Sequence, residues 1–161
     1  MKIGIVGTGM LGEAVGLHLL DVGYEIIVFN RSNEKTKNLK KNGATVVESP
    51  KEVAKNTDLV IIVVKDADAV NDVVFGDYGA LAGNHEGVCI ADMSTVNPNS
   101  TKEISEKVIA AGTDYLEIPV MEGREFLVRE KIRQIRKHLW KGCEWSGTRM
   151  NLIKPSQSSP V

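Results

Sequence analysis

The chain has 161 residues, of which 42% are hydrophobic and 25% charged, and its formal net charge is −1. This composition is typical of a globular protein, and the near-neutral charge argues against a nucleic acid or a membrane surface as a partner. The longest strongly apolar run, residues 59–64, is far shorter than the roughly 20 residues that span a bilayer. The cysteines and histidines are scattered, so we expect no metal site and a reduced, cytoplasmic protein.

Apolar runs alternate with amphipathic segments along the chain. Residues from Leu59 to Val64 are all apolar, as in a parallel strand that is covered on both faces. The predicted strands cover residues 2–6, 25–29, 44–47, 58–64, 88–91 and 115–118. The predicted helices cover residues 10–22, 32–41, 50–56, 67–75 and 97–111. The alternation predicts an α/β fold with a doubly wound, Rossmann-type, mostly parallel sheet.

The character of the chain changes after residue 123. Residues 1–123 hold 11 Lys and Arg against 18 Asp and Glu, whereas residues 124–161 hold 9 against 3. We therefore expect a first domain over 1–123 and a basic helical tail over 124–161. Within the tail, residues 124–140 have one narrow apolar stripe and no aromatic platform. This pattern favours a solvated surface helix over a nucleic-acid interface.

The stretch from Gly7 to Gly12 reads G-T-G-M-L-G and matches G-x-G-x-x-G directly after the first predicted strand. In a dinucleotide-binding loop the first glycine permits the tight turn, the second lets a pyrophosphate approach the backbone, and the third lets helix and strand pack closely. The alternative is a glycine turn that binds nothing, but the strand–loop–helix context favours a binding loop. The predicted phosphate-binding residues are Gly7, Thr8, Gly9, Met10, Leu11 and Gly12.

The end of the second predicted strand indicates which dinucleotide is preferred. NAD-binding sites usually have Asp or Glu here to hold the ribose 2′-hydroxyl. This chain has Asn30, Arg31 and Ser32 instead. Arg31 can pair with a 2′-phosphate and stack on adenine, and Ser32 can donate a hydrogen bond. These residues predict NADP in preference to NAD, unless Arg31 is only a solvated residue at a helix start.

Four segments follow one another in the order KIGIVGTGMLG, VFNRS, ADMSTVNP at 91–98 and EIPVMEG at 117–123. Together they resemble the N-terminal domain of the β-hydroxyacid dehydrogenases, the group of 3-hydroxyisobutyrate dehydrogenase, glyoxylate and succinic semialdehyde reductases and 6-phosphogluconate dehydrogenase. The most specific of them, 92–98, matches the family's D-x-S-T-x-x-P. The resemblance covers about residues 1–123 and implies a domain that binds NAD(P).

The resemblance also implies roles for individual residues. It implies that Ser94 binds the carboxylate or hydroxyl of a substrate, and that Thr95 lies near both substrate and nicotinamide ribose. Gly123 belongs to a segment whose backbone contacts substrate in the family. The adenine-ribose side of the cofactor would be lined by Val64, Lys65 and Asp66. Ser94 and Lys65 follow the carboxyl ends of predicted parallel strands, where ligands bind, and this agrees in part with these roles. Ser94 and Thr95 also suit a turn or cap before the helix at Pro98.

The chain departs from the family at two places. Glu122 stands where family members have a glycine that contacts substrate, so a carboxylate faces any acidic substrate. Full-length members also continue into an all-helical domain that carries a catalytic lysine. When the glycines of the tail are aligned with that motif, the lysine position falls on Asn151, and Lys154 is out of register. We therefore assign no catalytic residue.

Three functions remain open from the sequence. One is an NADP-dependent oxidoreductase that transfers hydride to or from a small hydroxy acid, a semialdehyde or glyoxylate. Another is an NADP-binding module without catalysis. A third is half of a split enzyme that a separate helical subunit completes. Because the missing helical domain would leave apolar surface at the crevice, we expect a homodimer or such a subunit as partner.

Overall fold

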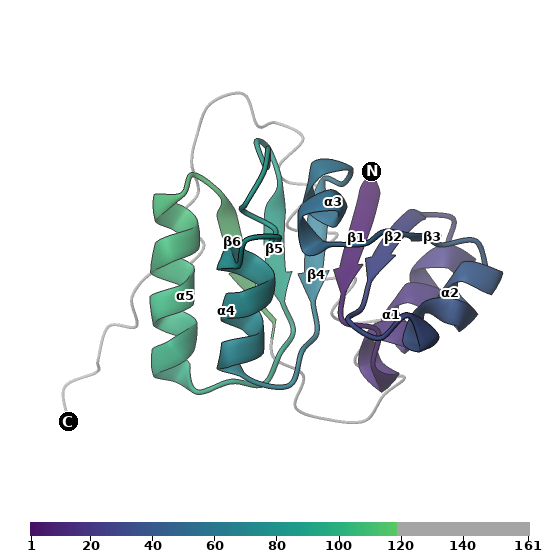
Figure 1. Cartoon of the computed structure of the whole chain (residues 1–161), viewed down its shortest axis with the longest axis horizontal. Helices are drawn as coiled ribbons and strands as arrows, with labels where there is room; N and C mark the ends of the chain where they lie inside the picture. Colours follow the sequence, from purple (N-terminus) through teal and green to yellow (C-terminus); the bar gives the residue numbers. More distant parts are fainter. Residues whose placement is uncertain (119–161) are drawn as a thin grey trace.

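The computed structural model describes residues 1–118, which form a six-stranded sheet with helices on both faces (Figure 1). The strands are β1 (Lys2–Val6), β2 (Glu25–Phe29), β3 (Thr45–Val46), β4 (Leu59–Ile62), β5 (Cys89–Asp92) and β6 (Asp114–Glu117). The helices are α1 (Met10–Asp21), α2 (Lys37–Lys41), α3 (Pro50–Lys55), α4 (Ala67–Phe75) and α5 (Pro98–Ala110), with a 3-10 turn η1 (Asn33–Thr36) before α2.

The strand order is β3-β2-β1-β4-β5-β6, and every pairing among these strands is parallel. The chain winds outward from β1 to β3, returns to β4 beside β1, and then winds outward to β6. Gly4 of β1 accordingly pairs with Ile27 on one side and Val60 on the other. The doubly wound parallel fold predicted from the sequence is confirmed. Ligands of such sheets bind at the reversal of strand order, outside the carboxyl ends of the strands.

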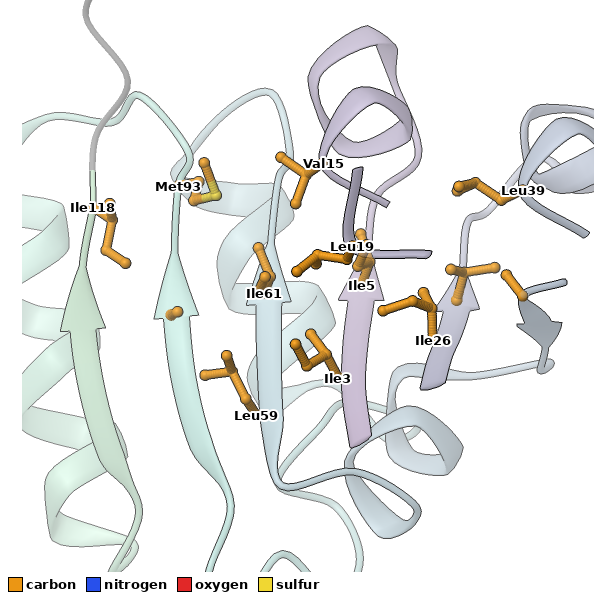
Figure 2. Packing of buried hydrophobic residues seen from close by; sticks show 13 residues of the cluster. Ile3, Ile5, Val15, Leu19, Ile26, Leu39, Leu59, Ile61, Met93 and Ile118 are labelled. Carbon is orange, nitrogen blue, oxygen red and sulfur yellow. The ribbon is translucent and has the colours of Figure 1, made fainter. Parts of the chain in front are cut away.

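One face of the sheet packs against α1 and α2. Ile5 of β1 and Ile61 of β4 meet Val15 and Leu19 of α1, and Leu39 of α2 extends the same cluster (Figure 2). All five side chains are at most 1% exposed. Burying a side chain of this kind contributes roughly 1.5–3 kcal/mol, so this cluster holds α1 in place. The position of α1 is what sets the loop between β1 and the helix.

The opposite face packs against α3, α4 and α5. Ile62 of β4 and Ile90 of β5 lie in one cluster with Val53, Val70 and Ile104 of the three helices. Successive residues of a strand point to opposite faces, so β4 supplies alternate side chains to the two cores. This is why the run at β4 is apolar at every position.

Several elements begin or end one or two residues from the predicted positions, and two of the differences have local reasons. The strand predicted over 58–64 ends at Ile62, because the Val64 N–H donates to a side chain, Ser94 Oγ, instead of a strand carbonyl. The helix predicted over 32–41 is split into η1 and α2. There the Thr36 hydroxyl donates to the Asn33 carbonyl at 2.8 Å, a local bond that competes with the regular helix ladder.

The helical tail predicted over 124–161 lies outside the described residues. Within residues 1–118, no helix combines the length and the apolar character needed to cross a membrane.

Candidate functional site

The loop between β1 and α1 contains three glycines that are under three different constraints. Gly7 has a φ of 97°, and a Cβ there would overlap the Val63 carbonyl oxygen. A Cβ on Gly12 would overlap the Gly7 carbonyl oxygen. A Cβ on Gly9, by contrast, would find nothing within 4 Å. Gly7 and Gly12 are therefore required by the fold itself, whereas the bare backbone at Gly9 borders open space.

The N-terminus of α1 opens onto the same space. Gly9 is the N-cap residue and offers no side chain to cap the helix. The first-turn N–H groups of a helix have no intrahelical acceptor and carry the positive end of the helix dipole. Thr8 beside them is 2% exposed, and its Oγ1 has no hydrogen-bond partner among the described residues. A pyrophosphate fits this arrangement, because it supplies the acceptors and the negative charge that the loop lacks.

The end of β2 is tied to this loop by one side chain. Asn30 Oδ1 accepts a hydrogen bond from the Thr8 N–H at 3.0 Å, and Asn30 Nδ2 donates to the Ser32 carbonyl at 3.0 Å. Arg31 and Ser32 are exposed. Arg31 forms no ion pair with any other of residues 1–118. A guanidinium and a hydroxyl thus stand beside the loop with no nearby carboxylate at the strand end.

The segment after β4 lies on the other side of the glycine-rich loop from the end of β2. A Cβ on Gly7 would also come close to Val64, so the segment and the glycine-rich loop are in direct contact. Lys65 pairs with Asp66 at 3.0 Å, and Asp66 Oδ1 accepts the Ala69 N–H at 2.9 Å to cap α4. The backbone hydrogen bond from Ala69 and the neighbouring Lys65 lower the pKa of Asp66 below its ordinary value. Asp66 is therefore a helix cap in this structure, which the sequence did not indicate.

A buried network of polar side chains holds the segment after β5. Asp92 Oδ1 accepts the Ser94 N–H at 2.8 Å, and Asp92 Oδ2 accepts the Tyr115 hydroxyl at 2.8 Å. Ser94 Oγ in turn accepts the Val64 N–H at 3.0 Å. We call these contacts of Asp92, Ser94 and Tyr115 the Asp92 network. It ties β6 and β5 to the segment after β4.

The Asp92 network is the part of the site that sequence reasoning missed. Asp92 is 1% exposed and Tyr115 2%. Burial, followed by the Asp92 charge, raises the pKa of Tyr115 far above its ordinary value, so the hydroxyl remains a hydrogen-bond donor. One signal was available: a carboxylate at the end of an apolar strand needs a buried partner. The neighbouring strand offers Tyr115.

Five of the residues predicted for the site lie along one line of contacts. Asn30 contacts Thr8, Gly7 adjoins Val63 and Val64, and Val64 contacts Ser94. Ser94 is buried, whereas Thr95 is exposed. The cap of α5 is neither of them but Asn97, whose Oδ1 accepts the Asn99 N–H at 2.9 Å. Gly123, Lys154 and Asn151 lie outside the described residues.

Metal-binding residues do not come together in residues 1–118, where no group of three or more His, Cys, Asp or Glu is placed to hold an ion. Cys89 is half-buried in β5, and burial raises the pKa of its thiol to about 12. A thiol with that pKa remains neutral at physiological pH and is a poor nucleophile or ligand.

Comparison with known proteins identifies the family of the chain. Residues 2–129 match the NAD binding domain of 6-phosphogluconate dehydrogenase. The chain belongs to this family. The match covers β1 to β6 and includes the loop, the strand ends and the Asp92 network, so these residues form an NAD(P)-binding domain of the kind found in oxidoreductases.

Curated relatives of this NAD-binding domain are longer than the chain. It is 36% identical over 119 residues to the cytokine-like nuclear factor N-PAC of Xenopus tropicalis, covering 74% of this chain and 22% of that protein. It is 35% identical over 139 residues to the uncharacterized oxidoreductase YfjR of Bacillus subtilis, covering 84% of this chain and 47% of that protein. The chain thus spans less than half the length of these two relatives.

Among solved structures, an imine reductase from Myxococcus stipitatus in complex with NADP⁺ has the same fold. Its TM-score is 0.73 at 22% identity, and the alignment covers 84% of this chain and 51% of that one. About half of that chain therefore has the architecture described here.

Proposed function

We propose that the chain binds NADP(H) in preference to NAD(H), as the cofactor-binding part of a hydride-transfer oxidoreductase. The observation that carries the proposal is the juxtaposition of two features. The uncapped N-terminus of α1 opens at Gly9, and Arg31 and Ser32 stand at the end of β2 without a carboxylate. An arginine and a hydroxyl suit a 2′-phosphate, and a helix N-terminus suits the pyrophosphate.

The residues of the chain divide the work of holding such a ligand. The N–H groups of the first turn of α1 would hold the pyrophosphate, and Arg31 would pair with the 2′-phosphate. Val64, Lys65 and Asp66 form the wall beside the adenine ribose. A nicotinamide dinucleotide, when bound, supplies the hydride. The imine reductase that shares this fold was solved in complex with NADP⁺, which supports a ligand of this class.

We propose a small carboxylate-bearing hydroxy acid, semialdehyde or glyoxylate as substrate, bound beside Ser94 and Thr95. The Ser94 hydroxyl accepts the Val64 N–H, which leaves its own hydrogen for a substrate oxygen. Both carboxylate oxygens of Asp92 accept hydrogen bonds within the fold, so we assign Asp92 a structural role. We propose that a helical partner, a second copy of the chain or a separate subunit, supplies the proton donor and completes the active site.

A calorimetric titration with NADPH and with NADH tests the cofactor, and an absorbance assay with semialdehydes and glyoxylate in the same sample tests the reaction. We expect NADPH to bind at least ten-fold more tightly than NADH, since one well-placed charged contact is worth roughly 1.5–3 kcal/mol. Binding of neither nucleotide would contradict the proposal.

The second candidate function is a cofactor-binding module or one half of a split enzyme. It is favoured by the Asp92 network, because Asp92, Ser94 and Tyr115 already form hydrogen bonds within the fold. The same titration separates the two functions. NADPH binding without turnover supports the module, whereas turnover by the chain alone supports the oxidoreductase.

A further inference from the structure

Asn30 occupies the position at which dinucleotide-binding domains usually contact the adenine ribose, yet its amide is already engaged on both sides. Its oxygen accepts the Thr8 N–H and its nitrogen donates to the Ser32 carbonyl, each at 3.0 Å. The two neighbours fix the orientation of the amide, because an N–H requires the oxygen and a carbonyl requires the nitrogen. Asn30 thus links its own turn to the loop that holds Thr8, which lies 22 residues away in sequence.

The two loops that it links have different tasks in the proposed NADP(H) site. Thr8 belongs to the loop that would hold the pyrophosphate, and Ser32 belongs to the turn that would hold the 2′-phosphate. We propose that Asn30 is a positioning residue, a brace that fixes these two loops relative to each other and thereby supports dinucleotide binding, while its neutral amide permits the 2′-phosphate of NADPH. The inference rests on the proposed function and deepens it.

The chemistry of the brace explains why an amide is suited to this position. An aspartate would keep an oxygen for the Thr8 N–H, but its second oxygen would face the Ser32 carbonyl, so two acceptors would repel each other. The added negative charge would also oppose a 2′-phosphate. An alanine would remove both contacts and leave the Thr8 N–H unpaired. Thr8 is 2% exposed, so its N–H has little access to water in exchange.

The test compares Asn30→Ala and Asn30→Asp in the full chain, by calorimetric titration with NADPH and NADH. In Asn30→Ala we expect both nucleotides to bind about three- to ten-fold more weakly, since both share the pyrophosphate loop. In Asn30→Asp we expect NADH binding to be restored to within about two-fold of the original, while NADPH binding falls by about ten-fold or more. A general loss of structure does not produce this selective rescue.

Asn33→Asp is the matched control. Asn33 lies three residues away at the start of η1, is exposed, and its side chain forms no hydrogen bond with any of residues 1–118. It adds the same charge near the turn without touching the brace, so we expect NADPH to lose less than about two-fold in affinity. If Asn33→Asp loses as much NADPH affinity as Asn30→Asp, the added charge alone accounts for the loss, and the proposal is overturned.

Amide hydrogen exchange of Thr8, followed by NMR without any ligand, tests the brace independently of the cofactor. We expect exchange to be at least about five-fold faster in Asn30→Ala than in the original chain, and unchanged in Asn30→Asp. Equal exchange in all three proteins overturns the brace even where NADPH binds as proposed. Failure of the original chain to bind either nucleotide instead defeats the proposed function, and the exchange result still reports on the loop.

Discussion

The glycine-rich loop at 7–12 and the Asp92 network lie at the carboxyl ends of strands from opposite halves of the sheet, and they are built in opposite ways. The loop owes its shape to missing side chains, because Gly7 and Gly12 leave room for the backbone itself. The Asp92 network owes its shape to polar side chains that are almost fully buried and satisfy one another. The loop should therefore be sensitive to added volume, and the network to the loss of a single hydrogen bond.

The largest effect is expected from added volume at Gly7. Gly7→Ala combines a φ of 97°, which an L side chain rarely adopts, with an overlap against the Val63 carbonyl. We expect a loss of about 2–6 kcal/mol in the free energy of unfolding. Urea denaturation of the two proteins, followed by circular dichroism, measures it. A loss below about 1 kcal/mol would mean that the loop relaxes and is not constrained by close packing.

Gly9→Ala is the matched control in the same loop. The new methyl group would meet no atom within 4 Å, and φ at Gly9 is −67°. We expect stability to stay within about 1 kcal/mol of the original. Nucleotide affinity, however, should fall by about ten-fold or more, because the methyl group occupies the space through which a pyrophosphate approaches the backbone. Unchanged affinity would place the phosphates elsewhere.

An intermediate effect is expected in the Asp92 network. Tyr115→Phe keeps the ring in the core but removes the hydroxyl, so Asp92 Oδ2 loses its 2.8 Å donor while it remains buried. A buried polar group left without its partner costs about 1–3 kcal/mol. We expect that loss in urea denaturation. Tyr24→Phe, on a half-buried tyrosine whose hydroxyl has no hydrogen bond within residues 1–118, is the control and should change stability by less than about 0.5 kcal/mol.

The same contrast explains which parts of the site could be predicted. The tasks of Gly7, Gly9 and Gly12 follow from a local motif between a strand and a helix, and the parallel fold follows from the alternation of apolar runs. The bonds Thr8–Asn30, Asp92–Tyr115 and Val64–Ser94 join residues 22, 23 and 30 positions apart. Such pairs depend on the order of strands in the sheet and on register, so no local pattern contains them.

Position in the sheet also decides between roles that the sequence left open. Both Ser94 and Asp66 were predicted as ligand-facing residues, and each has a hydrogen-bonding task within the fold. The prediction of a ligand role and the observation of a structural role are compatible for Ser94, whose hydroxyl hydrogen is still available. A ligand role and a structural role are less compatible for Asn30, because both the oxygen and the nitrogen of its amide already form hydrogen bonds.

The smallest effect is expected from titration at Cys89, at the amino end of the strand that carries Asp92. Burial raises the pKa of this thiol from 9.0 to about 12, and nearby Asp114 adds to the shift. Because the folded-state pKa is the higher one, the unfolded chain releases the proton first. The thiol therefore favours the folded state below pH 9, and that contribution is lost as the pH rises from about 9 toward 12. At pH 10 the loss should reach about 1 kcal/mol. Unfolding free energies of the original chain and Cys89→Ala, measured from pH 8 to 10, test this, because groups shared by both proteins cancel in the difference. The original chain should lose stability relative to the variant, and parallel curves would show that the thiol ionises as readily in the folded sheet as in the unfolded chain.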